Sequence, residues 1–223
     1  SDVYKRQLLP EYLGNEAPTW LERGGVYVVA NIRGGGEYGP DWHKAALKQN
    51  RHRSFEDFAA VAKDLIARKV TSSHHLGIRG ESNGGLLTGN MLTLYPHLFG
   101  CIVCGVPLLD MKRYTQLSAG ASWIAEFGDP DKPEEWDYIR TFSPYHNIKA
   151  EENYPPVLFY TATSDDRVNP AHARKMAARM QAMGHQQVYF YENTKGGHNA
   201  AADKQQAAFI SALVSEFMWF HLR

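Results

Sequence analysis

Short hydrophobic runs alternate along the chain with segments of helical periodicity. The run at 26–32 is β-branched and apolar almost throughout, which predicts a strand buried on both faces of a parallel sheet. Glycines at 34–36 end this run. Four later short runs, each bounded by turn residues, predict further strands: 75–79, 101–106, 157–162 and 188–191.

The first helical segment begins at about Ser54. Ser54 and Asp57 fit a capping box, in which two side chains accept backbone hydrogens at the start of a helix. Four apolar residues then fall on one helix face: Phe58, Val61, Ala62 and Leu65. Similar patterns predict three further helices: 86–95, 171–183 and a C-terminal helix that carries Phe209, Leu213, Phe217 and Phe220.

This alternation predicts an α/β fold, with a mainly parallel sheet and helices on both of its faces. Between 108 and 149 the pattern loosens and becomes rich in aromatic residues, Asp and Pro, so we expect an excursion of loops and short helices there. We find no internal repeat, low-complexity tract or linker, and therefore expect one domain over residues 1–223.

The composition fits that architecture and narrows the function. The chain has 223 residues, of which 43% are hydrophobic and 22% charged. Lys and Arg number 24, as do Asp and Glu, so the basic surplus of a nucleic-acid binder is absent. No apolar run approaches the roughly 18 residues of a membrane span, and two cysteines are too few for a disulfide scaffold. We expect a soluble domain of enzyme-like size.

The first seven residues look foreign to the rest of the chain. They lack an initiator Met and an apolar signal region, so we interpret 1–7 as a cloning or library remnant, or as the cut end of a longer protein. The compartment is therefore not assigned by the sequence. The absence of a signal region favours the cytoplasm.

The run Gly80-Glu81-Ser82-Asn83-Gly84 matches G-x-S-x-G and falls between a predicted strand and a predicted helix. A serine at such a sharp turn projects its hydroxyl above the carboxyl edge of the sheet, where the helix N-terminus supplies amide donors. The alternative is an ordinary glycine-rich loop.

A serine nucleophile needs a base, and the base needs an orienting carboxylate. Asp165 follows one predicted strand and His198 follows the next, which gives the chain order Ser, Asp, His of α/β-hydrolases. All three residues would then lie at one edge of the sheet. Asp166 is the alternative carboxylate. This chemistry requires no cofactor and no metal.

Five stretches together resemble the catalytic domain of the prolyl oligopeptidase family of serine peptidases. They are 31–39 (NIRGGGEYG), 80–87 (GESNGGLL), 142–147 (FSPYHN), 165–168 (DDRV) and 196–198 (GGH). The resemblance runs from about Gly24 to the end of the chain. It implies an α/β-hydrolase fold and a peptidase that cleaves after proline through an acyl-enzyme intermediate.

The resemblance also implies roles for individual residues. Ser82, Asp165 and His198 would form the triad, with the first aspartate of the DDRV run as its carboxylate. The Tyr38 hydroxyl and the backbone N–H of Asn83 would form the oxyanion hole, where a tetrahedral intermediate needs donors. The alternative for Tyr38 is a packing role.

Further residues would bind the substrate. Trp123 and Phe127 resemble the aromatic walls that hold a proline ring, and Val168 and Leu108 would complete this pocket. Arg167 resembles the arginine that binds a substrate backbone carbonyl. The alternatives are ordinary core aromatics for Trp123 and Phe127, and a surface ion pair for Arg167.

Two other motifs carry less weight. The glycines at 34, 36 and 39 match the G-x-G-x-x-G dinucleotide fingerprint, but the family resemblance explains them together with Tyr38. Cys101 and Cys104 have redox-like spacing, yet they lie within an apolar strand and point to opposite faces. We interpret them as buried free thiols. No histidine pair has metal-ligand spacing.

The chain departs from the family in two respects. We expect neither a β-propeller segment nor the first strands of the hydrolase sheet within these residues, and therefore an exposed sheet edge and a homo-oligomer formed through it. Without a propeller the site would be open, which favours a carboxylesterase acting on small esters as the alternative to a peptidase. A further alternative is a catalytically idle fragment that serves as a binding module. Neither nucleic acid nor a membrane is an expected partner.

Overall fold

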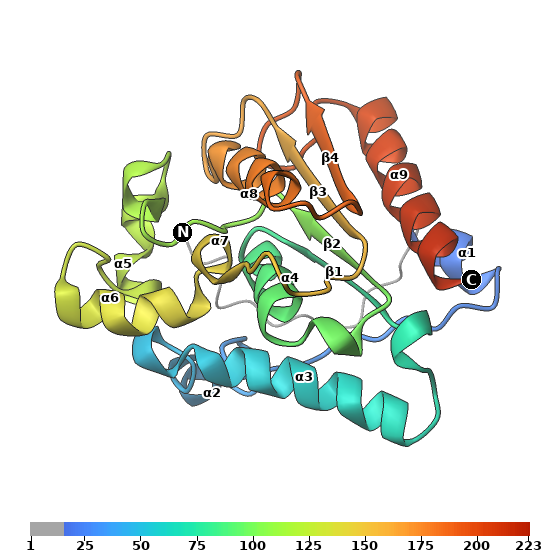
Figure 1. Cartoon of the computed structure of the whole chain (residues 1–223), viewed down its shortest axis with the longest axis horizontal. Coiled ribbons are helices and arrows are strands. Elements are labelled where there is room, and N and C mark those ends of the chain that lie inside the picture. The colour runs from blue at the N-terminus through green and yellow to red at the C-terminus, as the bar shows by residue number, and fades with distance from the viewer. Residues whose placement is uncertain (1–15) are drawn as a thin grey trace.

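A four-stranded parallel sheet forms the centre of the part of the chain that the computed structural model describes, residues 16–223. The foreign-looking segment 1–7 lies outside these residues. The strands are adjacent in chain order (Figure 1): β1 (Gly77–Glu81), β2 (Cys101–Gly105), β3 (Val157–Ala162) and β4 (Val188–Asn193). The predicted parallel sheet is confirmed, with β1 placed two residues later than expected.

The strand register brings the ends of all four strands to one edge. Gly80 pairs with Cys104, Cys104 with Phe159, and Phe159 with Phe190. Because the strands are parallel, the turns that follow each strand share the carboxyl edge. Residues far apart in sequence, at 82, 165 and 198, therefore leave the sheet on the same side.

Helices cover both faces of the sheet, as predicted (Figure 1). On one face, α4 (Asn83–Leu94) contacts β1 and β2, and α8 (Ala171–Ala182) contacts β3 and β4. On the other face, α9 (Lys204–Leu222) contacts β2. An outer helix, α3 (His52–Ala67), packs against α4. Two short helices precede it: α1 (Glu16–Leu21) and α2 (Pro40–Lys44).

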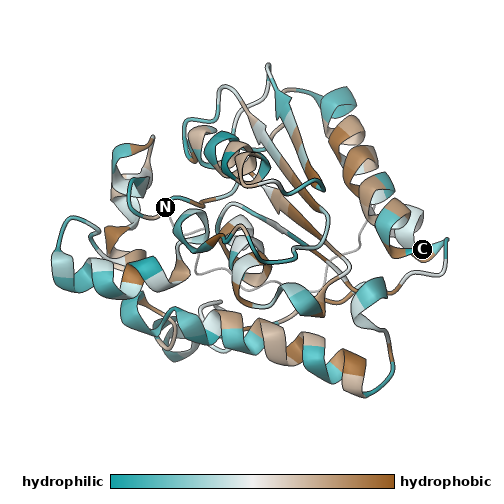
Figure 2. Cartoon of the chain, viewed as in Figure 1, coloured by the Kyte–Doolittle hydropathy of each residue, from teal (hydrophilic) through white to brown (hydrophobic). Residues whose placement is uncertain are grey.

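The two faces bury separate apolar cores. The larger core lies on the α4 and α8 face and includes Leu86, Ile102 and Met176. The smaller core lies under α9 and includes Val103, Leu158 and Val214. Figure 2 shows the hydrophobic colour concentrated on the strands and along α9, whereas α3 alternates between hydrophobic and hydrophilic residues as an outer helix should. The central strands β2 and β3 are buried along their whole length, which explains why they are almost entirely apolar.

The stretch between β2 and β3 consists of turns and short helices. The α-helical pieces are α5 (Ile124–Phe127), α6 (Pro133–Ile139) and α7 (Pro144–Asn147). One hydrogen bond joins the stretch to α4, and another joins two of its own segments. The side-chain amide of Asn90 donates to the carbonyl of Phe142 at 3.2 Å, and the backbone N–H of Tyr145 donates to Leu109 at 3.0 Å.

The predicted strand at 26–32 is wrong. These residues belong to no helix or strand, and Val26, Tyr27, Val28 and Val29 are each about half exposed or more. A cavity of about 1,140 Å³ separates this segment from β1. A strand needs a partner for its backbone groups, and among the described residues none lies beside this segment. The apolar pattern identified a segment suited to a sheet, but not whether a neighbour is present.

The predicted cap at Ser54 is also wrong, because α3 begins two residues earlier, at His52. Ser54 instead donates its hydroxyl to the Arg33 carbonyl at 2.6 Å. Asp57 accepts two hydrogen bonds from the Arg33 side chain, at 2.6 and 2.8 Å. The Arg33 guanidinium, through these hydrogen bonds, lowers the pKa of Asp57. The Ser54 hydroxyl and the Asp57 carboxylate therefore form tertiary hydrogen bonds to Arg33 instead of capping the helix.

Both cysteines are buried and free, as the sequence predicted. Burial raises the pKa of each thiol to about 12, because the apolar core disfavours a thiolate. None of the helices within residues 16–223 has the length and apolar character needed to cross a membrane.

We expect the exposed segment 26–29 and the edge of β1 to make the chain associate. Val26 is 66% exposed and Val29 is 56% exposed, and apolar surface next to an unpaired strand edge favours pairing with another chain. Light scattering of the purified chain should give the mass of a dimer or higher oligomer, and Val28→Lys should shift it toward the monomer. A monomeric mass for the unmodified chain would contradict this prediction.

Candidate active site

Ser82 occupies a strained turn between β1 and α4. Its backbone has φ 57° and ψ −114°, a conformation that side-chain-bearing residues rarely adopt. Such a conformation costs on the order of 1–3 kcal/mol and is kept where the surroundings impose it. The Ser82 N–H donates to the Gly105 carbonyl at 2.9 Å, which holds the turn against the end of β2.

Close backbone packing explains the glycines around Ser82. A Cβ on Gly80 would lie 2.2 Å from the carbonyl oxygen of Gly84, and one on Gly85 would lie 2.6 Å from Pro107. Gly84 has open space at the corresponding position. The G-x-S-x-G match therefore has a steric basis at Gly80, and Gly85 rather than Gly84 permits the close approach of α4 to the sheet.

Asp165 and His198 form a hydrogen-bonded pair at the same edge of the sheet. The Asp165 carboxylate is buried, and His198 Nδ1 lies 2.9 Å from Oδ2 and 3.1 Å from Oδ1. The backbone N–H groups of Arg167 and Val168 also donate to Oδ1, at 3.0 and 2.9 Å. Asp166 is exposed. Of the two candidate carboxylates, Asp165 is the one that contacts the histidine.

Ser82 is not hydrogen-bonded to His198 in the part of the chain that the structure describes. The turns that carry them follow β1 and β4, with the Asp165 turn after β3 between them. The structure thus brings two of the three expected triad residues into contact and places the third at the same sheet edge. Catalytic hydrogen bonds are often long before substrate binds and shorten in the complex.

The expected oxyanion donors lie on two separate segments. Asn83 is the first residue of α4, so its backbone N–H is among those that a helix leaves without an internal acceptor. Tyr38 lies in the glycine-rich loop 34–39, is 67% exposed, and packs edge-to-face on Trp42 at 5.0 Å between ring centroids. The packing role considered for Tyr38 therefore exists, and it leaves most of the ring exposed.

The four apolar residues expected in the substrate pocket are buried. Leu108, Trp123, Phe127 and Val168 all belong to the larger core. Phe127 is fully enclosed, with Tyr114 edge-to-face at 5.9 Å, whereas Trp123 retains 8% exposure. Arg167 is exposed, and its backbone carbonyl accepts a hydrogen bond from Ala119 at 3.3 Å.

Two buried polar groups near the site were not predicted from the sequence. The first is a cluster of His43, Arg51 and Glu126, which comes from three separate segments. The second is His172 on α8, whose Nδ1 accepts hydrogen bonds from the backbone N–H groups of Leu109 and Asp110, at 3.3 and 3.1 Å. No sequence motif signals either group, because each is formed by residues from segments that meet only in the folded chain.

His172 anchors the backbone next to Leu108 in its neutral form. It is 1% exposed, and desolvation lowers the pKa of its imidazole to about 4. The two N–H donors also require a lone pair on Nδ1, which protonation would remove.

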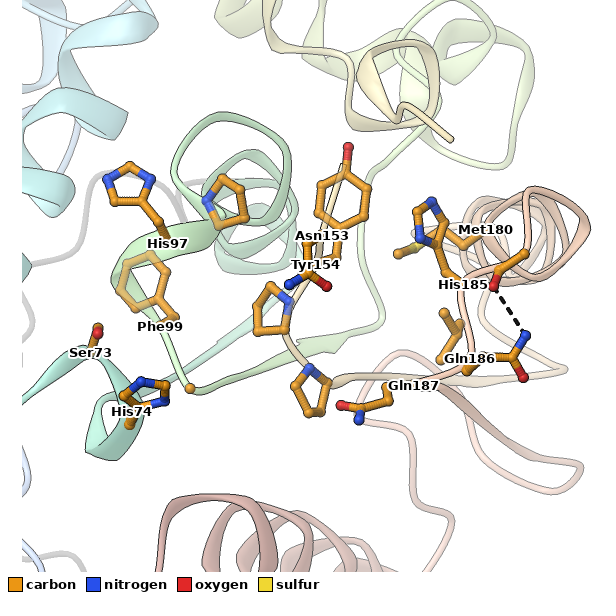
Figure 3. Close-up of a pocket in the computed structure, with 16 residues that line it drawn as sticks. Ser73, His74, His97, Phe99, Asn153, Tyr154, Met180, His185, Gln186 and Gln187 are labelled. Atoms are coloured by element: carbon orange, nitrogen blue, oxygen red, sulfur yellow. Dashed lines mark hydrogen bonds between the residues drawn. The ribbon is translucent and has the colours of Figure 1, made fainter. Parts of the chain in front are cut away.

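The structure has two cavities of interest. The larger, of about 1,140 Å³, extends from the 26–30 segment along β1 to Ser82 and Asn83. The smaller, of about 630 Å³, lies at the opposite, amino-terminal edge of the sheet, between the loops that precede the strands (Figure 3). Its lining includes His74, Phe99 and Gln187, none of which is an expected site residue. Within residues 16–223, no group of three or more His, Cys, Asp or Glu side chains could hold a metal ion.

Comparisons with known proteins show which proteins the chain is similar to. Residues 12–222 match the prolyl oligopeptidase family. The chain is 55% identical over 210 residues to an uncharacterized peptidase of Sinorhizobium fredii, and 39% identical over 206 residues to a prolyl endopeptidase of Elizabethkingia miricola. These alignments cover 94% and 91% of the chain. A solved post-proline cleaving enzyme from Rickettsia typhi superposes with a TM-score of 0.92 at 38% identity over 97% of the chain.

The chain spans about three tenths of the length of these relatives. It covers 29% of both the Sinorhizobium and the Elizabethkingia proteins, and 31% of the Rickettsia typhi chain. The likeness therefore concerns one part of each relative.

The depressed pKa of His172 predicts a loss of stability in acid. Because its pKa is about 4 in the folded chain and 6.5 when unfolded, the unfolded state gains the proton first as the pH falls. The contribution of neutral His172 to the free energy of unfolding is therefore complete above about pH 6.5 and is lost as the pH falls toward 4. Urea unfolding at pH 7.5 and 4.5 measures how much free energy of unfolding each protein loses between these pH values. The unmodified chain should lose about 2 kcal/mol more than the His172→Gln variant, which lacks this titrating group. Equal losses in both proteins would contradict the prediction.

Proposed function

Since the chain belongs to the prolyl oligopeptidase family, we propose that it is a serine hydrolase that cleaves peptides after proline through a covalent acyl-Ser82 intermediate. The observation that carries the proposal is the strained Ser82 turn at the sheet edge that also carries the buried Asp165–His198 pair. In α/β-hydrolases, a strained strand-to-helix turn of this kind presents the hydroxyl of the nucleophilic serine to the substrate. Two of the relatives are a prolyl endopeptidase and a post-proline cleaving enzyme, which favours proline as the residue before the scissile bond.

In the first half of the proposed reaction, His198 Nε2 takes the proton of the Ser82 hydroxyl as Oγ attacks the substrate carbonyl. Asp165 accepts the Nδ1–H of His198, which fixes the imidazole tautomer and stabilises the imidazolium that forms. His198 then protonates the leaving amine as the C–N bond breaks. This step leaves the acyl group on Ser82.

The second half repeats these transfers with water. His198 removes a proton from the water that attacks the acyl carbonyl, and returns it to Ser82 Oγ as the ester bond breaks. In both halves the carbonyl oxygen becomes negative. The Asn83 N–H, at the positive end of α4, and the Tyr38 hydroxyl are the donors that we assign to this charge.

A carboxylesterase activity is the second candidate. The cavity of about 1,140 Å³ that reaches Ser82 gives small acyl groups access to the nucleophile, and apolar residues such as Val28, Phe58 and Leu87 line it. The same acyl transfer hydrolyses esters and amides, so one triad would support both reactions.

Substitutions in the triad should remove activity without unfolding the chain. Ser82→Ala should abolish labelling by a fluorophosphonate probe and lower kcat by about a million-fold, because the nucleophile is lost. Asp165→Asn should lower kcat by about ten-thousand-fold, because the imidazole loses its orienting acceptor. Asp166→Asn is the matched control and should remain within about twofold of the unmodified chain, since Asp166 is exposed. Labelling that survives Ser82→Ala would contradict the proposal.

A substrate panel separates the two candidate activities. Chromogenic peptides with proline before the scissile bond should be cleaved with a kcat/KM about tenfold or more above their alanine counterparts, because the proline ring offers more apolar surface for contact than the alanine methyl group. The readout is release of the chromophore by the chain and by Ser82→Ala. Cleavage of a short aryl ester with no cleavage of any prolyl peptide would make the carboxylesterase the better assignment.

A further inference from the structure

A buried polar cluster connects the two segments to which we assign the oxyanion donors. It consists of Arg51, just before α3, Glu126 on α5 and His43 on α2. Their side chains are 4%, 12% and 11% exposed. The cluster lies outside the triad, and the proposed reaction assigns it no role.

Arg51 ties the start of α4 to the excursion between β2 and β3. Its Nη2 donates to Asn83 Oδ1 at 2.9 Å, and its Nη1 donates to Glu126 Oε1 at 2.9 Å. The guanidinium carbon also lies 4.7 Å from the centre of the Phe127 ring, within the range of a cation–π contact. One planar cation therefore fixes the side chain of the residue after Ser82 against two adjacent residues of α5.

Glu126 extends this connection to the glycine-rich loop. Its second carboxylate oxygen lies 3.3 Å from His43 Nε2, and His43 Nδ1 lies 2.8 Å from the carbonyl oxygen of Gly34. A carbonyl oxygen and a carboxylate oxygen both only accept, so both contacts are hydrogen bonds when each ring nitrogen of His43 carries a hydrogen. Nη1 of Arg51 also donates to Ala46, at 3.3 Å, just after α2. An unbroken series of polar contacts thus runs from Asn83 to the loop that carries Tyr38.

Stability alone is a poor explanation for such a cluster. Removing an arginine and a glutamate from water costs several kcal/mol per ion, and apolar residues of similar size often stabilise a protein as well or better. What a planar guanidinium supplies, and an apolar side chain does not, is fixed hydrogen-bond geometry at several positions. The cluster is therefore better explained by a need to hold its partners in place.

We propose that Arg51 is a positioning residue of the oxyanion hole: through Asn83 on one side and Glu126 and His43 on the other, it fixes the Asn83 N–H relative to the Tyr38 loop. This inference rests on the proposed serine hydrolase function. Donors of this kind act only if they are held where the charge develops, and a misplacement of about 1 Å can cost about a hundredfold in rate. Loss of Arg51 should therefore act on kcat more than on KM.

The test measures kcat and KM of the 223-residue chain with an aryl ester and a prolyl peptide, counting active sites by fluorophosphonate titration. Arg51→Met should lower kcat per titrated site by about tenfold or more and change KM by less than about threefold. Arg51→Lys keeps the positive charge but not the planar guanidinium, and its kcat should lie between those of Arg51→Met and the unmodified chain. Arg53→Met is the matched control: Arg53 lies two residues away and donates to Ala45, and its variant should keep the unmodified kcat.

A double-mutant cycle distinguishes positioning from general destabilisation. Asn83→Ala removes the acceptor of Arg51 but keeps the backbone N–H of residue 83. If the two residues act together, the double variant should lose no more kcat than Arg51→Met alone, whereas additive losses would overturn the inference. If Arg51→Met fails to fold, Asn83→Ala and Arg51→Lys carry the test, and an unchanged kcat in both would overturn it.

The titration separates this inference from the function on which it rests. A chain whose Ser82 reacts with the probe, yet whose kcat is indifferent to Arg51, would refute the positioning role and leave the hydrolase intact. A folded chain whose Ser82 does not react at all would overturn the proposed function, and the positioning role with it.

Discussion

The left-handed backbone conformation of Ser82 is the constraint on which the site depends. A φ of 57° at a residue with a side chain is unfavourable by itself, so the neighbouring elements have to impose it. They do so from three directions: the Gly105 carbonyl holds the Ser82 N–H, Gly80 allows the Gly84 backbone to approach, and Gly85 lets α4 pack on Pro107. The turn leads directly into α4, whose first N–H groups have no acceptor within the helix.

The parallel sheet supplies the rest of the constellation. Since β3 and β4 run in the same direction as β1, the turns after them carry Asp165 and His198 to the edge where Ser82 lies. Two backbone N–H groups donate to the buried Asp165 carboxylate in addition to His198. The position of the carboxylate therefore does not depend on the imidazole alone. The pair and the serine come from different strands, and their relation depends on the register of the whole sheet.

The sequence predicted what local patterns encode. Apolar runs identified the four strands, and the G-x-S-x-G turn identified the strained serine. The sequence did not predict that segment 26–32 lies outside the sheet. An apolar run indicates a preference for burial, but it does not show whether a neighbouring strand is present. The sequence also did not predict the hydrogen bond from the Ser54 hydroxyl to the Arg33 carbonyl. Nor did it predict the cluster of Arg51, Glu126 and His43. These depend on segments that meet only in the folded chain. Phe127, which resembles a wall of the family's proline pocket, is fully enclosed by packing, and this too depends on the folded chain.

The most direct test of this account is a crystal structure of the chain after reaction with a small fluorophosphonate, whose adduct resembles a tetrahedral intermediate. The account predicts phosphorus bonded to Ser82 Oγ, with one phosphonyl oxygen accepting hydrogen bonds from the Asn83 N–H and the Tyr38 hydroxyl. His198 Nε2 should then lie within hydrogen-bond distance of Ser82 Oγ, with Nδ1 still on Asp165. An adduct on another residue, or a phosphonyl oxygen directed to solvent with both donors elsewhere, would contradict the account.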